Sequence, residues 1–176
     1  MSFPFVVSLS NHGRAFGVPF DKLRANGLVT LLQARRYVDS MYLLDINILI
    51  ALADPDHEHH GKAESFFLAN HHLGWATCPI TENGFVRIIS SSSYPRGPDN
   101  TDAACAILKQ LCAHEGHRFW PDDLSLRSAS FLPASKHLTD HYLLSLAMHR
   151  QGKLATLDRH INAALIPGGA DAYVVL

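Results

Sequence analysis

The sequence predicts an α/β fold in which a parallel sheet of about five strands is flanked by helices. Short apolar runs alternate with longer segments of helical periodicity from residue 41 onward. The chain has 176 residues, a length that suits one domain with one sizeable core. Its composition, 47% hydrophobic and 18% charged residues, is ordinary for a globular protein.

The predicted strands are short apolar runs, and two of them end at an aspartate. The first, residues 42–44, stops at Asp45, and residues 46–52 continue it as a buried passage from strand to helix. The remaining strands are expected at residues 74–77, 118–120, 154–157 and 173–176. The fourth of the five strands runs directly into Asp158.

The predicted helices lie between these strands and carry recognisable end signals. They are expected at residues 57–70, 79–89, 101–114 and 139–150. Pro79 fits the first turn of a helix that is capped near Thr77. Thr139 is the predicted N-cap of the last helix, and Gly152 is its stop.

Residues 1–40 differ from the rest of the chain. They lack a sustained period, and they resemble translated repetitive DNA found ahead of bacterial reading frames. Met41 stands directly before the first strand, so we expect residues 1–40 to be a non-native or loosely ordered extension and residues 41–176 to be the working domain. A genuine, loosely packed N-terminal extension is the alternative interpretation.

Charge and composition exclude several classes of protein. The formal net charge of −1 provides no general basic field for nucleic acid, and residues 41–176 alone carry ten basic against fourteen acidic residues. No apolar run approaches the roughly 18 residues that span a bilayer, and no secretory signal is evident, which predicts a cytoplasmic protein without a membrane. The three cysteines form no CxxC pair and are expected to be small buried residues.

Four acidic residues stand at the edges of apolar runs: Asp45, Glu82, Asp140 and Asp158. Ligands of open α/β sheets bind beyond the carboxyl ends of the strands, and this fold can bring all four acids to that edge. Taken singly, the two acids in first helical turns also suit the helix dipole, and Asp158 suits a turn. Asp45 is the least ordinary, because an acid within an apolar run needs a compensating partner.

The segments around these acids resemble the motifs of a known family. They read L-L-D-I-N-I-L-I-A-L, T-E-N-G-F-V-R-I, L-T-D-H-Y-L-L-S-L-A and L-A-T-L-D-R, in this order along residues 41–176. Together they are similar to the four acidic motifs of PIN-domain nucleases, and most of all to the VapC-type toxins of bacterial toxin–antitoxin pairs. One departure is Ile46, where many members of the family have threonine.

The resemblance implies a PIN-like three-layer domain with metal-dependent endoribonuclease activity. A cluster of carboxylates offers only oxygen ligands, which select Mg²⁺ or Mn²⁺. The implied ligands are Asp45 and Asp140, with Glu82 shared or in an outer position and Asp158 completing the site directly or through water. Asn47 and Thr156 are expected to orient carboxylates or waters, and Thr139 to cap the helix beneath Asp140.

The same resemblance implies an RNA substrate of the tRNA or rRNA class, a cognate antitoxin and a homodimer. Two alternatives remain open: a non-catalytic PIN-fold binding module, and a free-standing PIN nuclease without an antitoxin. A phosphatase-like hydrolase with Asp45 as nucleophile would need a second aspartate two residues later, and that position is Asn47, whose amide transfers no proton. The cluster His57-Glu58-His59-His60 does not match the HExxH pattern of zinc proteases.

Overall fold

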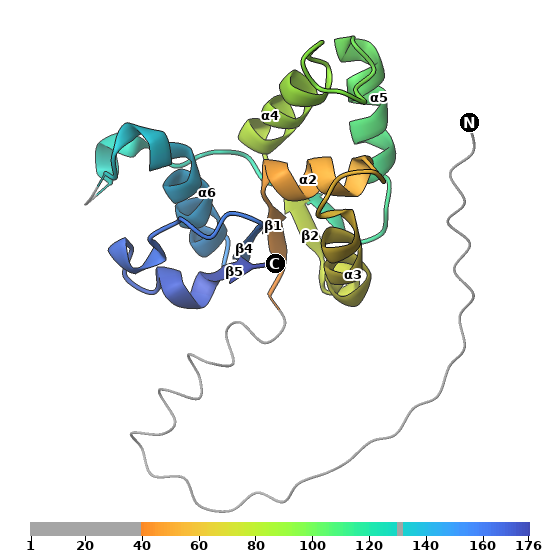
Figure 1. Ribbon diagram of the computed structural model, residues 1–176. Coiled ribbons are helices and arrows are strands. Elements are labelled where there is room, and N and C mark those ends of the chain that lie inside the picture. Colours follow the sequence, from red (N-terminus) through yellow and green to blue (C-terminus); the bar gives the residue numbers. More distant parts are fainter. Residues whose placement is uncertain (1–39, 130–131) are drawn as a thin grey trace, which may run out of the picture.

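Five parallel strands form one sheet in the computed structural model, which describes residues 40–129 and 132–176 (Figure 1). The strands are β1 (Tyr42–Leu44), β2 (Trp75–Thr77), β3 (His117–Phe119), β4 (Lys153–Thr156) and β5 (Tyr173–Val175). The predicted parallel sheet of about five strands is therefore confirmed. The predicted extension, residues 1–40, lies outside the described residues except for its last residue.

The order of the strands places β1 at the centre of the sheet. The order is β3-β2-β1-β4-β5, so the chain first builds outward to one edge and then returns to the other side of β1. Leu44 of β1 is paired with Ala155 of β4. The gap between the ends of β1 and β4 is thus the topological switch point of the sheet, where open α/β folds bind their ligands.

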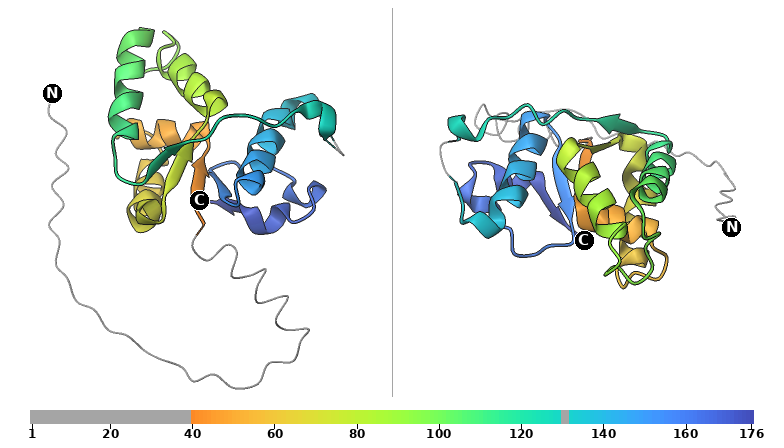
Figure 2. Two further views of the ribbon diagram at one scale, coloured as in Figure 1. Left: turned by 180° about the vertical axis from the view of Figure 1, so that it is seen from behind. Right: turned by 90° about the horizontal axis from the view of Figure 1, so that it is seen from above.

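Helices cover both faces of this sheet, as Figures 1 and 2 show. One face carries α2 (Ile46–Ala53), α3 (His60–Asn70), α4 (Pro79–Ile89) and α5 (Thr101–Cys112). The other carries α6 (Leu138–His149). Single 3-10 turns complete the described residues: η1 (His71–Leu73), η2 (Leu126–Ser128), η3 (Ser135–His137), η4 (Ala163–Leu165) and η5 (Gly169–Ala172). The three-layer arrangement agrees with the fold class predicted from the sequence.

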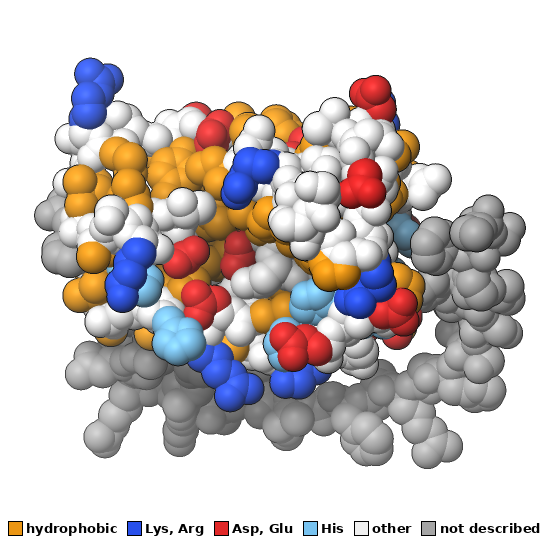
Figure 3. All heavy atoms as spheres, turned by 45° about the horizontal axis from the view of Figure 1, so that its top comes forward, with side chains coloured by type: hydrophobic (Ala, Val, Ile, Leu, Met, Phe, Trp, Pro, Cys, Tyr) orange, Lys and Arg blue, Asp and Glu red, His pale blue; other side chains and the backbone are white. Residues whose placement is uncertain are grey.

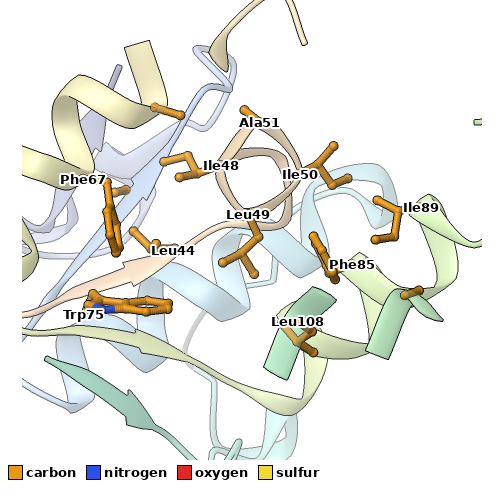
Figure 4. Packing of buried hydrophobic residues seen from close by; sticks show 13 residues of the cluster. Leu44, Ile48, Leu49, Ile50, Ala51, Phe67, Trp75, Phe85, Ile89 and Leu108 are labelled. Carbon is orange, nitrogen blue, oxygen red and sulfur yellow. The ribbon is translucent and has the colours of Figure 1, made fainter. Parts of the chain in front are cut away.

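The two sides of the sheet have separate apolar cores, because successive side chains of a strand point to opposite faces. Leu44 and Trp75 belong to the cluster shown in Figure 4, which α2 to α5 close. Leu43 and Leu154 belong to the second cluster, which α6 closes. Each of these leucines is at most 1% exposed, and burial of such a side chain stabilises the fold by roughly 1.5–3 kcal/mol.

The structure corrects two predicted element ends and locates a third. Residues 46–52 are not a passage out of a strand, because α2 begins at Ile46 and the Asp45 side chain accepts its first backbone N–H. The N-cap of α4 is Cys78, next to Thr77 as expected, and the Thr77 hydroxyl bonds to Glu82. The N-cap of α6 is His137, so Thr139 lies inside the first turn and does not cap the helix.

Gly84 allows α4 to approach α2 closely. A Cβ atom at this position would lie 2.4 Å from Cδ1 of Ile46, which is far below van der Waals contact. A larger residue would force the Ile46 side chain to move from its present position. The contact packs the first residue of α2 against α4.

The loop after α4 is attached to the end of α2 on the face away from α6. Asp54, the C-cap of α2, accepts hydrogen bonds from the Tyr94 hydroxyl at 2.7 Å and from the Arg96 side chain at 3.0 Å. These contacts hold the segment that the sequence marks as a serine-, proline- and glycine-rich loop. Within the described residues, no helix is long and apolar enough to cross a membrane.

Candidate metal centre at the carboxyl edge of the sheet

Asp45 is the central acid of the site. It follows β1 directly, is only 7% exposed, and serves as the N-cap of α2. Oδ1 accepts the backbone N–H of Ile46 at 2.7 Å. Oδ2 accepts the Asn47 side-chain amide at 2.8 Å and the Thr156 hydroxyl at 2.6 Å. These donors explain how a carboxylate is retained in a largely apolar region.

Asn47 and Thr156 tie the acid to the neighbouring strand. The Asn47 amide also donates to the Thr156 hydroxyl at 2.9 Å, and the Asn47 carbonyl oxygen accepts the N–H of Leu157 at 3.1 Å. The Thr156 hydroxyl further accepts the N–H of Asp158 at 3.0 Å. This network joins the ends of β1 and β4 and sets the position of Asp45 relative to Asp158.

Asp140 and Asp158 complete a cluster around Asp45. Asp140 lies in the first turn of α6, and its side chain is 25% exposed. Asp158 follows β4 by two residues, and its Oδ1 accepts both the backbone N–H of His160 at 2.7 Å and a contact from the His160 ring at 2.9 Å. Figure 3 shows acidic side chains gathered around a hollow on this face of the molecule.

The three carboxylates influence one another electrostatically. Burial, followed by the nearby charges of Asp45 and Asp158, raises the pKa of Asp140 to about 6. Burial also raises the pKa of Asp45, against the lowering effect of its hydrogen bonds. The pKa of Asp158 is lowered, because its bonds with His160 outweigh its partial burial. Burial and mutual repulsion therefore disfavour the ionised forms of Asp45 and Asp140.

The structure does not bring Glu82 into this cluster. Its Oε1 accepts the Thr77 hydroxyl at 2.6 Å, and Cys112 and His117 lie beside it, with possible ligand atoms of the three residues within 4.8 Å of one another. Thr77 points to the same face of the sheet as Trp75, two residues earlier in β2, whereas Asp140 belongs to the helix on the opposite face. Asp45, Asp140 and Asp158 thus influence one another electrostatically, whereas Glu82 is hydrogen-bonded to Thr77.

The Glu82 region is internally satisfied. The Thr77 hydroxyl donates to Glu82 and lies 2.9 Å from Nε2 of His117, so it occupies the centre of the group. Burial lowers the pKa of His117, and burial together with Glu82 raises the pKa of Cys112 to about 11. A protonated thiol and a neutral imidazole fit a hydrogen-bonded network that links β2, β3, α4 and α5.

The aspartate cluster fits a hard divalent cation. Its donors are all carboxylate oxygens, which suit Mg²⁺ or Mn²⁺. Within the described residues, these aspartates form ion pairs with histidines only: His137 lies 4.0 Å from Asp140, and His160 lies beside Asp158. Oδ1 of Asp45 accepts one hydrogen bond and keeps a lone pair. The clustered charge and the free lone pairs are what a cation would satisfy.

Sequence reasoning missed the two histidines that accompany the aspartates. His137 precedes Asp140 by three residues, the spacing that places two side chains on one helix face. His160 follows Asp158 by two residues, the spacing of an aspartate-stabilised turn. Both signals are in the sequence, but each is common enough to pass as ordinary local structure.

Comparison with known proteins identifies the family. The chain is 36% identical to Ribonuclease VapC44 of Mycobacterium tuberculosis over 137 residues, which cover 75% of this chain and 96% of that protein. It is 42% identical to Ribonuclease VapC38 of the same species over 120 residues, covering 67% and 85% of the two chains. Ribonuclease VapC29 is 37% identical over 133 residues, covering 71% and 96%. The chain belongs to the VapC family. A search of protein-family models found no match.

Membership of the VapC family confirms the resemblance drawn from the four acidic motifs. It also agrees with the five-stranded parallel sheet flanked by helices, the PIN-like architecture expected from the sequence. In this VapC protein, the switch point of the sheet and the aspartate cluster coincide, so the fold and the candidate metal centre indicate the same edge of the molecule.

Proposed function

We propose that this VapC protein is an Mg²⁺- or Mn²⁺-dependent endoribonuclease and the toxin of a toxin–antitoxin pair. One observation carries the proposal: three aspartates converge at the switch point of a parallel sheet, and within the described residues none of them forms an ion pair with a lysine or arginine. The relatives, each named a ribonuclease, support RNA as the substrate.

Asp45, Asp140 and Asp158 are the proposed metal ligands. Asp45 is held by three donors, so its free lone pair on Oδ1 is directed by the fold rather than by solvent. Asp140 makes no hydrogen bond among those found in the described residues, which leaves both of its oxygens available. Asp158 uses Oδ1 for His160 and keeps Oδ2.

The reaction adds water across a phosphodiester P–O bond of RNA. A bound Mg²⁺ or Mn²⁺ would neutralise charge on the phosphate oxygens and make a bound water more acidic. Asn47 and Thr156 keep the Asp45 carboxylate in one orientation, because each donates to Oδ2 and both are fixed by further bonds to β4 or its loop. Their role is positioning, and they need no contact with RNA.

The role predicted for Glu82 stays a prediction. In this structure its carboxylate bonds to Thr77 on the other face of the sheet. If Glu82 serves the metal in an outer position, a Glu82→Gln variant loses activity and recovers part of it at high Mn²⁺. If it only joins β2 to α4, the variant loses thermal stability and keeps its metal dependence.

The partners follow from the same family. We propose that a cognate antitoxin covers the acidic edge of the sheet, that the protein forms a homodimer, and that the substrate is a structured RNA such as tRNA or rRNA. Co-expression with a neighbouring small DNA-binding protein should give a stable complex without nuclease activity. Full activity in that complex would favour a free-standing nuclease.

Cleavage of total tRNA and of ribosomal RNA by the purified protein tests the activity. We expect internal cuts in the presence of Mg²⁺ or Mn²⁺, no cuts in EDTA, and none by an Asp140→Asn variant. Mapping of the new 5′ ends identifies the substrate and shows that the cuts are internal. Absence of any cleavage by the wild-type protein with either ion would favour a non-catalytic binding module.

A further inference from the structure

A hollow of about 370 Å³ lies beside the aspartate cluster. One wall is α4, which contributes Pro79, Asn83 and Arg87, and Ile46 and Thr139 close the side toward the cluster. Its size is within the range of roughly 300–1,000 Å³ that is typical of sites for small ligands. The hollow is therefore large enough for a single nucleotide.

Two residues that line the hollow are sequence neighbours of proposed metal ligands. Ile46 directly follows Asp45, and Thr139 directly precedes Asp140. An RNA strand with its scissile phosphate at the aspartates would therefore place an adjoining nucleotide in or next to this hollow. On the face drawn in Figure 3, acidic side chains and a basic side chain stand around a floor of apolar side chains.

Arg87 is the cation of this hollow. It is exposed in the last turn of α4, and no hydrogen bond or ion pair is found for it within residues 40–129 and 132–176. An arginine that no internal carboxylate engages keeps its full fork of donors for a phosphate. In a domain whose net charge is negative, such a group provides the local positive charge that RNA needs near the acidic site.

Asn83 and Asp122 make the hollow selective. Asn83 precedes Arg87 by four residues, so both side chains lie on one face of α4. An asparagine amide offers both a donor and an acceptor to a base edge. The Asp122 carboxylate repels a phosphate but can accept a hydrogen bond from the amino group of a base. This arrangement favours a phosphate at Arg87 and a base toward Asp122.

We propose that this hollow binds the nucleotide adjoining the scissile phosphate, with Arg87 bonded to a non-scissile phosphate and Asn83 to the base. The inference rests on the proposed ribonuclease function and extends it to a substrate subsite. Ile46 and Pro79 supply apolar contacts for the sugar or the face of the base. Arg87 is a binding residue in this arrangement and takes no part in bond cleavage.

The salt dependence of RNA binding tests the subsite independently of cleavage. The probe is a fluorescein-labelled single-stranded RNA that spans the mapped cut, and all proteins carry Asp140→Asn to prevent cleavage. We expect Arg87→Gln to weaken binding about tenfold, which corresponds to about 1.4 kcal/mol, because the variant loses a hydrogen bond to a charged phosphate. The slope of log K against log salt should fall by about 0.7, the value for one phosphate contact on a single strand.

Lys62→Gln is the matched control, because it also removes one exposed positive charge but lies on α3, outside the hollow. It should leave both the affinity and the slope unchanged. Replacing single phosphates of the probe by neutral methylphosphonates then locates the contact. One position should weaken binding of the Arg87 protein and have no further effect on the Arg87→Gln protein.

The outcomes separate the subsite from the activity. Wild-type cleavage together with equal affinity and slope for Arg87→Gln and Lys62→Gln would overturn the subsite and leave the ribonuclease intact. Failure of the wild-type protein to cleave any RNA would instead overturn the proposed function. An Asn83→Ala variant that cuts with a changed base preference at a similar maximal rate would support the assignment of Asn83 to the base, and an unchanged preference would refute it.

Discussion

Asp45 and Asp140 carry the same charge but differ in what holds them. Asp45 accepts three hydrogen bonds from Ile46, Asn47 and Thr156, whereas no hydrogen bond is found for Asp140 within the described chain. Substitutions of these two aspartates can therefore distinguish effects on cleavage from effects on the stability of the fold.

Replacing Asp140 by asparagine should abolish cleavage and leave the protein folded. The change removes one charge and no hydrogen bond. Replacing Asp45 by asparagine should also abolish cleavage. The new side-chain NH₂ can no longer accept the hydrogen bonds that Asn47 and Thr156 donate to Oδ2 of Asp45, and the loss costs about 1–3 kcal/mol of unfolding free energy. Chemical denaturation and cleavage rates on both variants check this. Equal destabilisation by the two changes would contradict the hydrogen-bond assignment.

Thr156 is the second residue that tests the network. Thr156→Val keeps the shape but removes the hydroxyl that donates to Asp45 and accepts from Asn47 and Asp158. We expect a lower melting temperature and a lower kcat, because Asp45 loses its orientation. Thr156→Ser should restore both, since it returns the hydroxyl. A valine variant with wild-type kcat would show that the orientation of Asp45 does not limit the reaction.

At the scale of elements, the site consists of the ends of β1 and β4 and the starts of α2 and α6. The sequence predicted these elements well, because apolar runs and helical spacing are local signals. It did not predict that Asp45 itself caps α2 or that His137 is the N-cap of α6, because caps depend on a few backbone angles that composition does not specify.

The sequence could not predict which partner the Glu82 side chain binds, for a different reason. Its helix was predicted correctly over residues 79–89. Its carboxylate accepts a hydrogen bond from the Thr77 hydroxyl, which also contacts the His117 ring. His117 lies 40 residues away from Thr77 along the chain, on the neighbouring strand. A motif shows that an acid is present, whereas the pairing of strands decides which face of the sheet it serves.

The start of α6 also makes stability depend on pH. Burial and the charges of Asp45 and Asp158 raise the pKa of Asp140 from its ordinary value of 3.8 to about 6 in the folded protein, so folding favours its protonated form. The corresponding stability is fully present below 3.8 and is lost as pH rises through about 6. Without metal, the melting temperature should therefore fall across this interval, and less so for Asp140→Asn.

Addition of Mg²⁺ or Mn²⁺ should reverse that loss above pH about 6, because a cation compensates the ionised carboxylates. Thermal unfolding over this pH interval, with EDTA and with added metal, measures the effect. The Lys62→Gln protein serves as a control for charge removal elsewhere. A metal-induced rise that is the same at low and neutral pH would argue against Asp140 as a ligand.

At the scale of the whole molecule, the strand order creates the site. The order β3-β2-β1-β4-β5 brings Asp45 next to Thr156, although 111 positions separate them in the sequence. A parallel sheet was predictable from the alternation of elements, but its strand order was not. That order depends on which three- or four-residue strands pair, and such short runs carry little pairing information.

The boundary of the domain gives a prediction at this scale. A protein that begins at Met41 should fold with the same melting temperature and cleave RNA at the same rate as the full chain, because both apolar cores and the aspartate cluster lie after this residue. Calorimetry and cleavage assays on the two proteins compare them. A truncated protein that is unstable or inactive would show that residues 1–40 belong to the working domain.

The central claim is that Asp45, Asp140 and Asp158 hold a divalent ion that is needed to cut RNA. The most direct test is the rate of RNA cleavage as Mn²⁺ is titrated into metal-free wild-type and Asp140→Asn proteins side by side. The account predicts a wild-type rate that rises from zero and saturates, and an Asp140→Asn rate at least about 100-fold lower at every concentration. Cleavage by the wild-type protein without metal, or equal rates for the two proteins, would contradict it.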